Sequence, residues 1–288
     1  MAEEIFLNII TRDRPELALI TLELLYETAD RQDSFIPTIT IDSDQIDLYR
    51  PLQSKFKDLR TAVVEHTPGS LRNCYIKQLD LFLESKCCFL LGICDDLTAI
   101  LKKWDKHLLT QKSLYPDDLY TLYSASNYCG RIPQVCAANY CIEKESPFTN
   151  LNHLNLKTFP NLSMDNPSDF DFLTLWGYAE PCPVFTRAFA KYVREAFVRS
   201  SCAVSIDIIV AALVQQLYRV SGESRNVLGW PDHIRFIDDK FTFNNFSKST
   251  EKGIAFDTEM IKSLANNMAM EILLFKDKNR QLKALNPM

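Results

Sequence analysis

Short apolar runs recur along the first third of the chain, and polar residues bound each of them. They predict strands at residues 5–10, 36–41, 61–65 and 87–93. The last run, Cys87–Ile93, carries no charged residue, which is typical of a strand buried on both faces of a sheet. The sequence therefore predicts a set of strands of which at least one lies deep inside the protein.

Segments whose apolar residues recur at helical spacing lie between these runs. One helix is expected from Pro15 to about Thr28, and another after Pro68-Gly69-Ser70, where Ser70 is a candidate cap. Alternation of strand, helix and strand is typical of an α/β protein with a mostly parallel central sheet flanked by helices. At 288 residues the chain is long enough for one large α/β domain or two small ones.

The rest of the chain is less regular. Further strands are expected at residues 119–124, 182–186 and 233–237, and further helices at residues 97–109, 187–197 and 205–218. Residues 127–168 are rich in Asn, Pro and Cys with weak periodicity, as in long functional or flexible segments. Apolar residues at helical spacing from Ile261 to Phe275 predict a final helix, with Asp257 as its cap.

Polar residues directly follow three of the predicted strands. Thr11-Arg12-Asp13-Arg14 follows the first, Asp42-Ser43-Asp44 the second and Asp95-Asp96 the apolar run that ends at Ile93. In a parallel sheet these strand ends meet at one edge, where open α/β sheets bind ligands. Adjacent carboxylates are both ionised most easily beside a cation, and Mg²⁺ or Mn²⁺ often bridges a carboxylate to a phosphate. A solvated turn is the alternative for the Asp-Asp pair taken alone.

Composition narrows the choice of partner. The net charge of −5 gives no support for general nucleic-acid binding. The nine cysteines include no C-x-x-C pair, so we expect no zinc site and reduced thiols in the cytoplasm. We find neither G-x-x-x-x-G-K-[ST] nor G-x-G-x-x-G among the seven glycines. No apolar run reaches the ~18–20 residues that a transmembrane helix needs.

In their order, these motifs resemble the family 2 nucleotide-sugar glycosyltransferases, which have the GT-A fold. Thr11-Arg12-Asp13-Arg14-Pro15 is similar to the start of that family's domain, and Gly69-Ser70-Leu71-Arg72-Asn73 to its G-x-x-x-R-N helix start. The segment 89–96 is similar to the strand that ends in its D-x-D motif. The resemblance covers residues 4–110 and extends more weakly to residues 178–207. It implies a GT-A domain over residues 1–245, with a nucleotide-binding half (1–110) and an acceptor half (111–245), and a helical extension over residues 246–288.

The resemblance also implies a role for each strand end. The nucleotide would be bound by Thr11, Arg12, Arg14, Asp42, Asp44, Arg72 and Asp95. Asp96 would bind Mn²⁺ or Mg²⁺, with His233 as a further ligand. Cys94 stands where the family has the first acid of D-x-D, and a thiol is a poor ligand for hard cations, so a weakened metal dependence stays open.

A base is needed to take the proton from an acceptor hydroxyl. The resemblance implies an acid at a helix start in the second half, and Asp207 is the expected residue. A carboxylate at that place is also favoured by the helix dipole alone. Asp165, Asp169 and Glu180 are the competing choices.

The function implied is transfer of a sugar from a UDP- or GDP-linked donor to a hydroxyl of a glycan, lipid or protein. A nucleotidyltransferase that makes nucleotide sugars is one alternative, although its usual Gly-rich loop and Lys are absent from Thr11–Pro15. A catalytically inactive binding or scaffold protein with a GT-A fold is the other, and Cys94 favours it. We expect no nucleic-acid partner and no transmembrane segment, and the final helix either packs on its own domain, forms a dimer contact or lies on a membrane.

Overall fold

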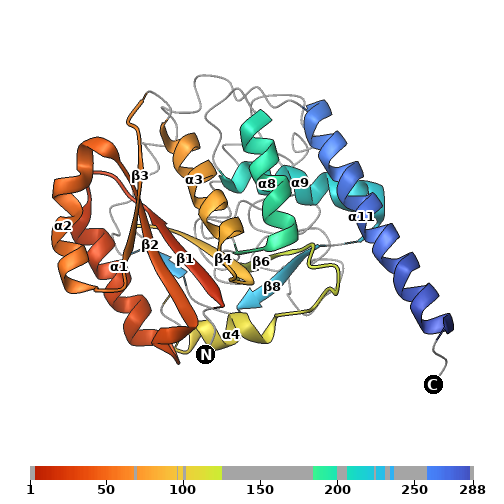
Figure 1. The fold of residues 1–288 in the computed structure, drawn as a ribbon, viewed down its shortest axis with the longest axis horizontal. Coiled ribbons are helices and arrows are strands. Elements are labelled where there is room, and N and C mark those ends of the chain that lie inside the picture. The colour runs from red at the N-terminus through yellow and green to blue at the C-terminus, as the bar shows by residue number, and fades with distance from the viewer. Residues whose placement is uncertain are drawn as a thin grey trace, which may run out of the picture.

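The computed structural model describes residues 4–67, 70–95, 97–99, 102–124, 184–199, 206–223, 225–230, 234–236 and 258–285. Its described strands form a seven-stranded sheet in the order β3-β2-β1-β4-β7-β6-β8 (Figure 1). These strands are β1 (Ile5–Ile10), β2 (Phe35–Asp42), β3 (Arg60–Val64), β4 (Phe89–Cys94), β6 (Thr121–Ser124), β7 (Val184–Thr186) and β8 (Asn226–Trp230). Six of them, all except β8, coincide with strands predicted from the sequence.

The sheet is mostly parallel, as predicted. β1 pairs in parallel with β2 and β4, and β2 with β3, whereas β7 is antiparallel to both of its neighbours. Ile10 is level with Thr40 of β2 and with Cys94 of β4. The carboxyl ends of β1, β2 and β4 therefore meet at one edge of the sheet, and the polar residues that follow them are brought together.

One face of the sheet is covered by α1 (Pro15–Thr28), α2 (Ile46–Lys55) and α4 (Trp104–Thr110). Their buried side chains pack on Ile5, Leu7 and Ile9 of β1. Trp104 is fully buried there and donates its Nε1–H to the carbonyl oxygen of Leu25 at 2.9 Å. This hydrogen bond satisfies the indole N–H, the only polar group of the side chain, while the rest of the ring makes apolar contacts.

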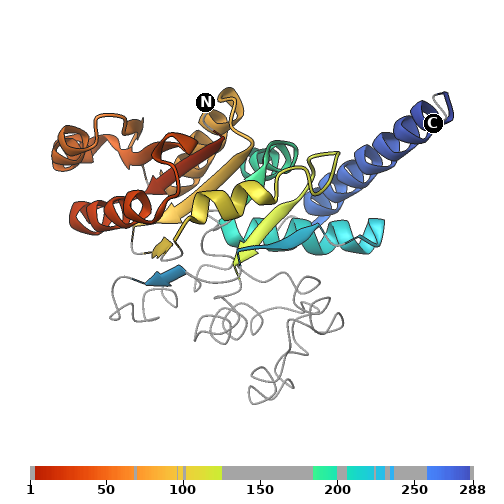
Figure 2. The same ribbon diagram turned by 90° about the horizontal axis from the view of Figure 1, so that it is seen from below.

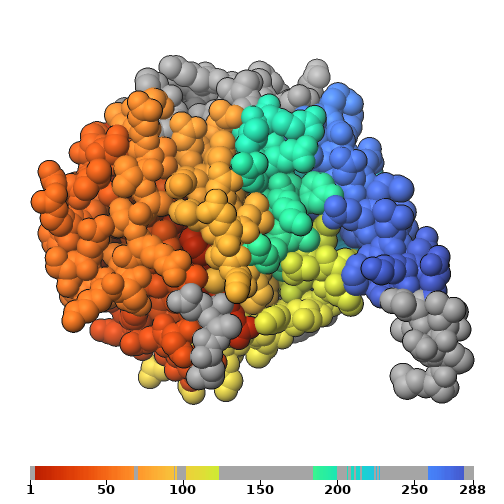
Figure 3. Space-filling model, in the orientation of Figure 1, coloured from red at the N-terminus to blue at the C-terminus, as the bar shows by residue number. Residues whose placement is uncertain are grey.

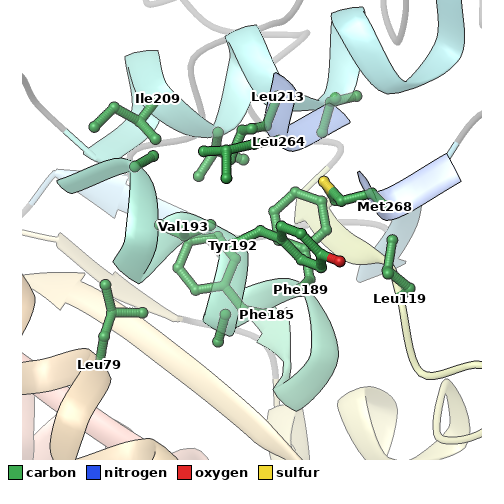
Figure 4. Close-up of a cluster of buried hydrophobic side chains, with 14 of the residues drawn as sticks. Leu79, Leu119, Phe185, Phe189, Tyr192, Val193, Ile209, Leu213, Leu264 and Met268 are labelled. Atoms are coloured by element: carbon green, nitrogen blue, oxygen red, sulfur yellow. The ribbon is translucent and has the colours of Figure 1, made fainter. Parts of the chain in front are cut away.

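The other face is covered by α3 (Ser70–Glu84) and α8 (Arg187–Arg199), onto which α9 (Ile206–Ser221) and α11 (Thr258–Leu285) pack. The side chains of Phe185, Phe189, Leu213 and Leu264 meet in this second core (Figure 4). α3, α8 and α11 lie side by side on one surface of the molecule (Figure 3). The first half of α11 is thus part of the core, whereas its carboxyl end extends beyond the other elements (Figures 1 and 2).

The helix predicted for residues 97–109 is wrong at its start. Leu97–Ala99 is a strand, β5, which pairs antiparallel with β9 (Ile234–Phe236) in a separate two-stranded sheet (Figure 2). The helix α4 begins only at Trp104, after Lys103 adopts a left-handed conformation with φ of 63°. The apolar spacing was correct for α4, but pairing with a distant strand determines the conformation of the residues before it.

One further α-helix, α2, and one further strand, β8, were not predicted. α2 contains Pro51, which normally breaks a helix, and buries only Tyr49 and Leu52, so its apolar periodicity is weak. β8 is short and was not recognised between α9 and the predicted strand at residues 233–237. The irregular segment 127–168 and the cap Asp257 lie outside the described residues. Within the described part of the chain, no helix combines the length and apolar character needed to cross a bilayer.

Candidate functional site at the carboxyl edge of the sheet

The β1–α1 loop, residues 11–14, lies at the carboxyl edge beside β2. The amide of Thr11 donates to the carbonyl oxygen of Thr40 at 3.2 Å, which extends the β1–β2 ladder by one residue. After this point the loop turns sharply, because Asp13 has a left-handed backbone with φ of 58°. Arg12 and Arg14, on either side of the turn, reach different acids.

Arg12 is the positive centre of the first group. Its Nη1 lies 2.5 Å from Asp42 Oδ2 and 3.0 Å from Asp44 Oδ1, and its Nη2 lies 2.8 Å from Asp44 Oδ2. Asp42 is buried at the end of β2, and Asp44 is exposed in η2 (Ser43–Gln45), a short 3₁₀ helix. The hydrogen bond from Arg12 lowers the pKa of the Asp44 carboxyl, and the same two acids raise the pKa of the guanidinium. The Arg12 guanidinium therefore lies between the two carboxylates and is hydrogen-bonded to both.

His66 completes this group. Its Nδ1 lies 3.1 Å from Arg12 Nη1 and 3.3 Å from Asp42 Oδ2, and its amide donates to Ser43 Oγ at 3.3 Å. Asp42, Asp44 and His66 each offer a ligand atom, and these atoms lie within 4.8 Å of one another. Such a set suits a divalent cation in its donor atoms. The Arg12 guanidinium contacts all three of these side chains through Nη1.

Asp95 belongs to a second, buried group. Its Oδ1 lies 2.6 Å from Arg14 Nη2, and its Oδ2 accepts a hydrogen bond from Thr11 Oγ1 at 2.7 Å. Its backbone carbonyl accepts from Thr21 Oγ1 at 2.8 Å. The carboxylate is fully buried, and a buried charge is tolerated only when it is paired and hydrogen-bonded in this way. Asp95 therefore anchors the β1–α1 loop to the end of β4.

Two side chains from the η2–α2 segment also contact this loop. The Tyr49 hydroxyl lies 2.6 Å from Thr11 Oγ1 and accepts the Arg14 amide at 3.2 Å, and Gln45 Oε1 accepts the Asp13 amide at 3.1 Å. Burial raises the pKa of the Tyr49 phenol above its ordinary value. A neutral tyrosine and a neutral amide thus fix the backbone of the loop that carries the two arginines.

Arg72 lies in the first turn of α3 but contacts a different part of the molecule. Its Nε donates to the carbonyl oxygen of Phe197 at 2.8 Å, and its Nη2 to that of Val198 at 2.9 Å. These carbonyls belong to the last turn of α8, where helix carbonyls lack intrahelical partners. In this structure Arg72 links α3 to α8 and makes no described contact with the groups around Arg12 and Arg14.

The structure brings together six of the residues that the sequence assigned to a nucleotide site. They are Thr11, Arg12, Arg14, Asp42, Asp44 and Asp95. Asp96 and His233 lie outside the described residues, as do Asp165, Asp169 and Glu180. Asp207 lies in the first turn of α9, and only its backbone is described; the same holds for Cys94 at the end of β4.

Sequence reasoning missed three residues of the site. His66 follows β3 by two positions, so the strand-end rule that located Asp42 and Asp95 applies to it as well. Gln45 and Tyr49 were missed because α2 was not predicted. No local signal distinguishes Tyr49 from an ordinary core tyrosine, since its role depends on contacts with a loop more than 30 residues away in the chain.

Comparison with solved structures shows that the chain has a GT-A-like fold. It is similar to glucosyl-3-phosphoglycerate synthase from Mycobacterium tuberculosis in complex with Mn²⁺, UDP and phosphoglyceric acid, with a TM-score of 0.52 and 8% identity over 91% of this chain and 78% of that one. It is also similar to the mannosyltransferase PcManGT from Pyrobaculum calidifontis in complex with GDP-Man and Mn²⁺, with a TM-score of 0.50 and 11% identity over 100% of this chain and 77% of that one. No protein-family model and no curated protein sequence matches this chain. At these identities the likeness establishes the fold.

Proposed function

We propose that the protein is a glycosyltransferase that moves a sugar from a nucleoside diphosphate sugar to a hydroxyl acceptor. The observation that carries the proposal is the meeting of the Arg12 and Arg14 groups at the carboxyl edge of β1, β2 and β4. This is the edge at which open α/β sheets bind ligands. The similar solved structures contain UDP or GDP-Man, which supports a nucleoside diphosphate as the ligand here.

The proposed nucleotide-binding residues differ in exposure, and we propose different roles for the exposed and the buried ones. Arg12, Asp44 and His66 are partly exposed, and they would contact the nucleoside or its phosphates. Thr11 and Asp95 are buried, and they would hold the loop rather than contact the ligand. Arg72 would act on the nucleotide only after leaving the carbonyls of α8, so its role in binding is the least direct.

We propose that Mn²⁺ or Mg²⁺ is bound by Asp96, with His233 as a further ligand. A carboxylate oxygen and an imidazole nitrogen are donors that Mn²⁺ accepts, and Asp96 directly follows the anchored Asp95. The metal would stabilise the negative charge of the departing nucleoside diphosphate. The similar structures contain Mn²⁺, which supports a divalent cation of this kind.

Asp207 remains the proposed base, since it lies in the first turn of α9. We keep the proposed division into a GT-A domain over residues 1–245 and an extension over residues 246–288. A cytoplasmic location is proposed because Cys74 and Cys88 are free thiols, which is typical of a reducing compartment. The acceptor would be a hydroxyl of a glycan, lipid or protein.

Titration calorimetry with UDP and GDP, each with and without Mn²⁺, tests the proposal. We expect metal-dependent binding of one of them, and loss of sugar transfer in Asp96→Ala with unchanged thermal stability. Asp277→Ala, at an exposed carboxylate of α11, is the matched control and should keep full activity. An active Asp96→Ala protein would refute the metal assignment, and absence of nucleotide binding would favour a binding or scaffold protein. Release of pyrophosphate from a nucleoside triphosphate and a sugar phosphate would instead identify a nucleotidyltransferase.

A further inference from the structure

The β1–α1 loop contains a turn that side chains from outside the loop hold in place. Asp13 is left-handed, and this conformation costs a non-glycine residue ~1 kcal/mol or more. The two arginines on either side of it are drawn in different directions, Arg12 toward Asp42 and Arg14 toward Asp95. Contacts from outside the loop must therefore stabilise the turn.

Counting donors and acceptors fixes the direction of the hydrogen bonds around Tyr49. Thr11 has one hydroxyl proton, and it donates that proton to Asp95 Oδ2, because an ionised carboxylate only accepts. Thr11 Oγ1 must then accept the proton of the Tyr49 hydroxyl, 2.6 Å away. The Tyr49 oxygen in turn accepts the Arg14 amide proton at 3.2 Å.

These bonds form a closed circuit. It runs from the Arg14 amide through Tyr49 and Thr11 to Asp95, and it returns to Arg14 through the ion pair of its guanidinium with Asp95 Oδ1 at 2.6 Å. Tyr49 is the member that comes from outside the sheet edge, and its side chain is fully buried. It can play this part only as a neutral phenol, in line with the raised pKa that burial gives it.

We infer that Tyr49 is a positioning residue for nucleotide binding, and that Gln45 supports the same loop by accepting the Asp13 amide. Tyr49 holds the β1–α1 loop so that Arg12 faces the open edge of the sheet beside Asp42 and Asp44. Tyr49 is buried and its described hydrogen bonds are to Thr11 and Arg14, so it acts through these two residues and not on the ligand. This inference rests on the proposed function, since it concerns the same nucleotide site.

The test is Tyr49→Phe in the full chain, which removes one hydroxyl and leaves the packed ring. We expect the affinity for the diphosphate that the wild type binds to fall about tenfold, as for the loss of one to two buried hydrogen bonds. In the transfer reaction KM for the donor should rise by a similar factor while kcat changes little. The matched control is Tyr26→Phe, whose hydroxyl donates to Asp58 Oδ2 at 2.7 Å in another part of the molecule. The Tyr26→Phe variant should lose a similar amount of unfolding free energy, but its affinity for the diphosphate should be unchanged.

A second readout needs no ligand. Amide hydrogen exchange of residues 11–14 should become faster in Tyr49→Phe than in Tyr26→Phe, because the Arg14 amide loses its acceptor. Unchanged exchange, or equal loss of affinity in both variants, would overturn the positioning role. Wild-type protein that binds no nucleotide would overturn the proposed function, whereas a wild type that binds and a Tyr49→Phe variant of equal affinity would overturn the positioning role alone.

Discussion

Arg12 does locally what a bound cation would do for two neighbouring carboxylates. Its guanidinium contacts Asp42 and both oxygens of Asp44, and the hydrogen bond from Arg12 lowers the pKa of Asp44. The group is partly exposed, and its ionic bonds are open to exchange for a ligand that carries negative charge. A phosphate group is such a ligand, since arginine binds two phosphate oxygens in the same bidentate geometry in which it binds the two oxygens of a carboxylate.

We expect Arg12→Ala to raise the pKa of Asp44 toward its ordinary value and to weaken nucleotide binding. The reason is that the hydrogen bond from Arg12 is the main cause of the lowered pKa. An NMR titration of the carboxyl carbons measures the pKa directly. Arg31→Ala, which removes an exposed partner of Asp33, should leave the Asp44 titration unchanged. An unchanged Asp44 pKa in Arg12→Ala would contradict this account.

Asp95→Asn should destabilise the protein. The change leaves the Arg14 guanidinium beside a neutral group while the amide can still accept from Thr11. Breaking a buried ion pair costs about 3–5 kcal/mol, and since Arg14 is half exposed we expect about 1–3 kcal/mol in urea unfolding. Asp33→Asn, in an exposed pair with Arg31, should change the free energy of unfolding by less than about 0.5 kcal/mol. Equal effects in the two variants would argue against the burial of the Asp95 pair.

At the scale of elements, α2 has a low intrinsic helix propensity, yet it carries Tyr49, which contacts the β1–α1 loop. Pro51 stands in its interior, and only Tyr49 and Leu52 are buried. Proline there removes one backbone hydrogen bond and disfavours the helix. α2 therefore depends on the packing of Tyr49 and Leu52 against the sheet, and this is the helix from which Tyr49 reaches the β1–α1 loop.

Pro51→Ala should stabilise the protein by about 1–2 kcal/mol, because the exposed site regains a helical hydrogen bond. Part of this gain is offset, because the unfolded chain has more conformational entropy without the proline. The midpoint of urea unfolding measures the effect. Pro15→Ala is the comparison, since proline suits the first turn of α1 and is buried there. We expect that second change to lower stability, and a lower midpoint in Pro51→Ala would contradict the role given to Pro51.

The same elements show how far the sequence predicts the structure. β1 and β4 are almost wholly apolar, and residues 36–41 of β2 alternate and are rich in β-branched residues, so these strands and the polar residues after them were located in advance. Helix α2 was hidden by Pro51, and β5 was hidden because its conformation depends on pairing with Ile234–Phe236. The partners of Arg14 and Arg72 could not be predicted, because long side chains reach acids or carbonyls that only the folded chain brings near.

At the scale of the whole molecule, thiol and phenol protons that are partly or fully buried make the stability of the fold sensitive to high pH. Burial raises the pKa of the Cys74 thiol to about 12 and that of Cys88 to about 11. It also raises the pKa of the phenols of Tyr26 and Tyr49. The folded state keeps these protons at pH values where the unfolded chain releases them, so their stabilisation is complete at low pH and is lost as pH rises through the raised pKa values.

The free energy of unfolding should therefore fall as pH rises above about 9, the ordinary thiol pKa. Cys88→Ser removes one such proton and keeps a donor for the Glu4 carbonyl. Between pH 9 and 11 its stability should fall less steeply than that of the wild type, by at most ~1.4 kcal/mol per pH unit for one group. Urea unfolding at several pH values measures both slopes, and parallel slopes would refute the assignment to Cys88.

Arg72 connects two helices of the same layer. Its guanidinium belongs to α3, next to the strands that carry the proposed nucleotide site, and it donates to carbonyls of the last turn of α8. Any hinge motion that separated these helices would leave the two carbonyls and the cation without partners, at a cost of about 1–3 kcal/mol. Ligand binding is therefore expected to leave α3 and α8 fixed relative to each other.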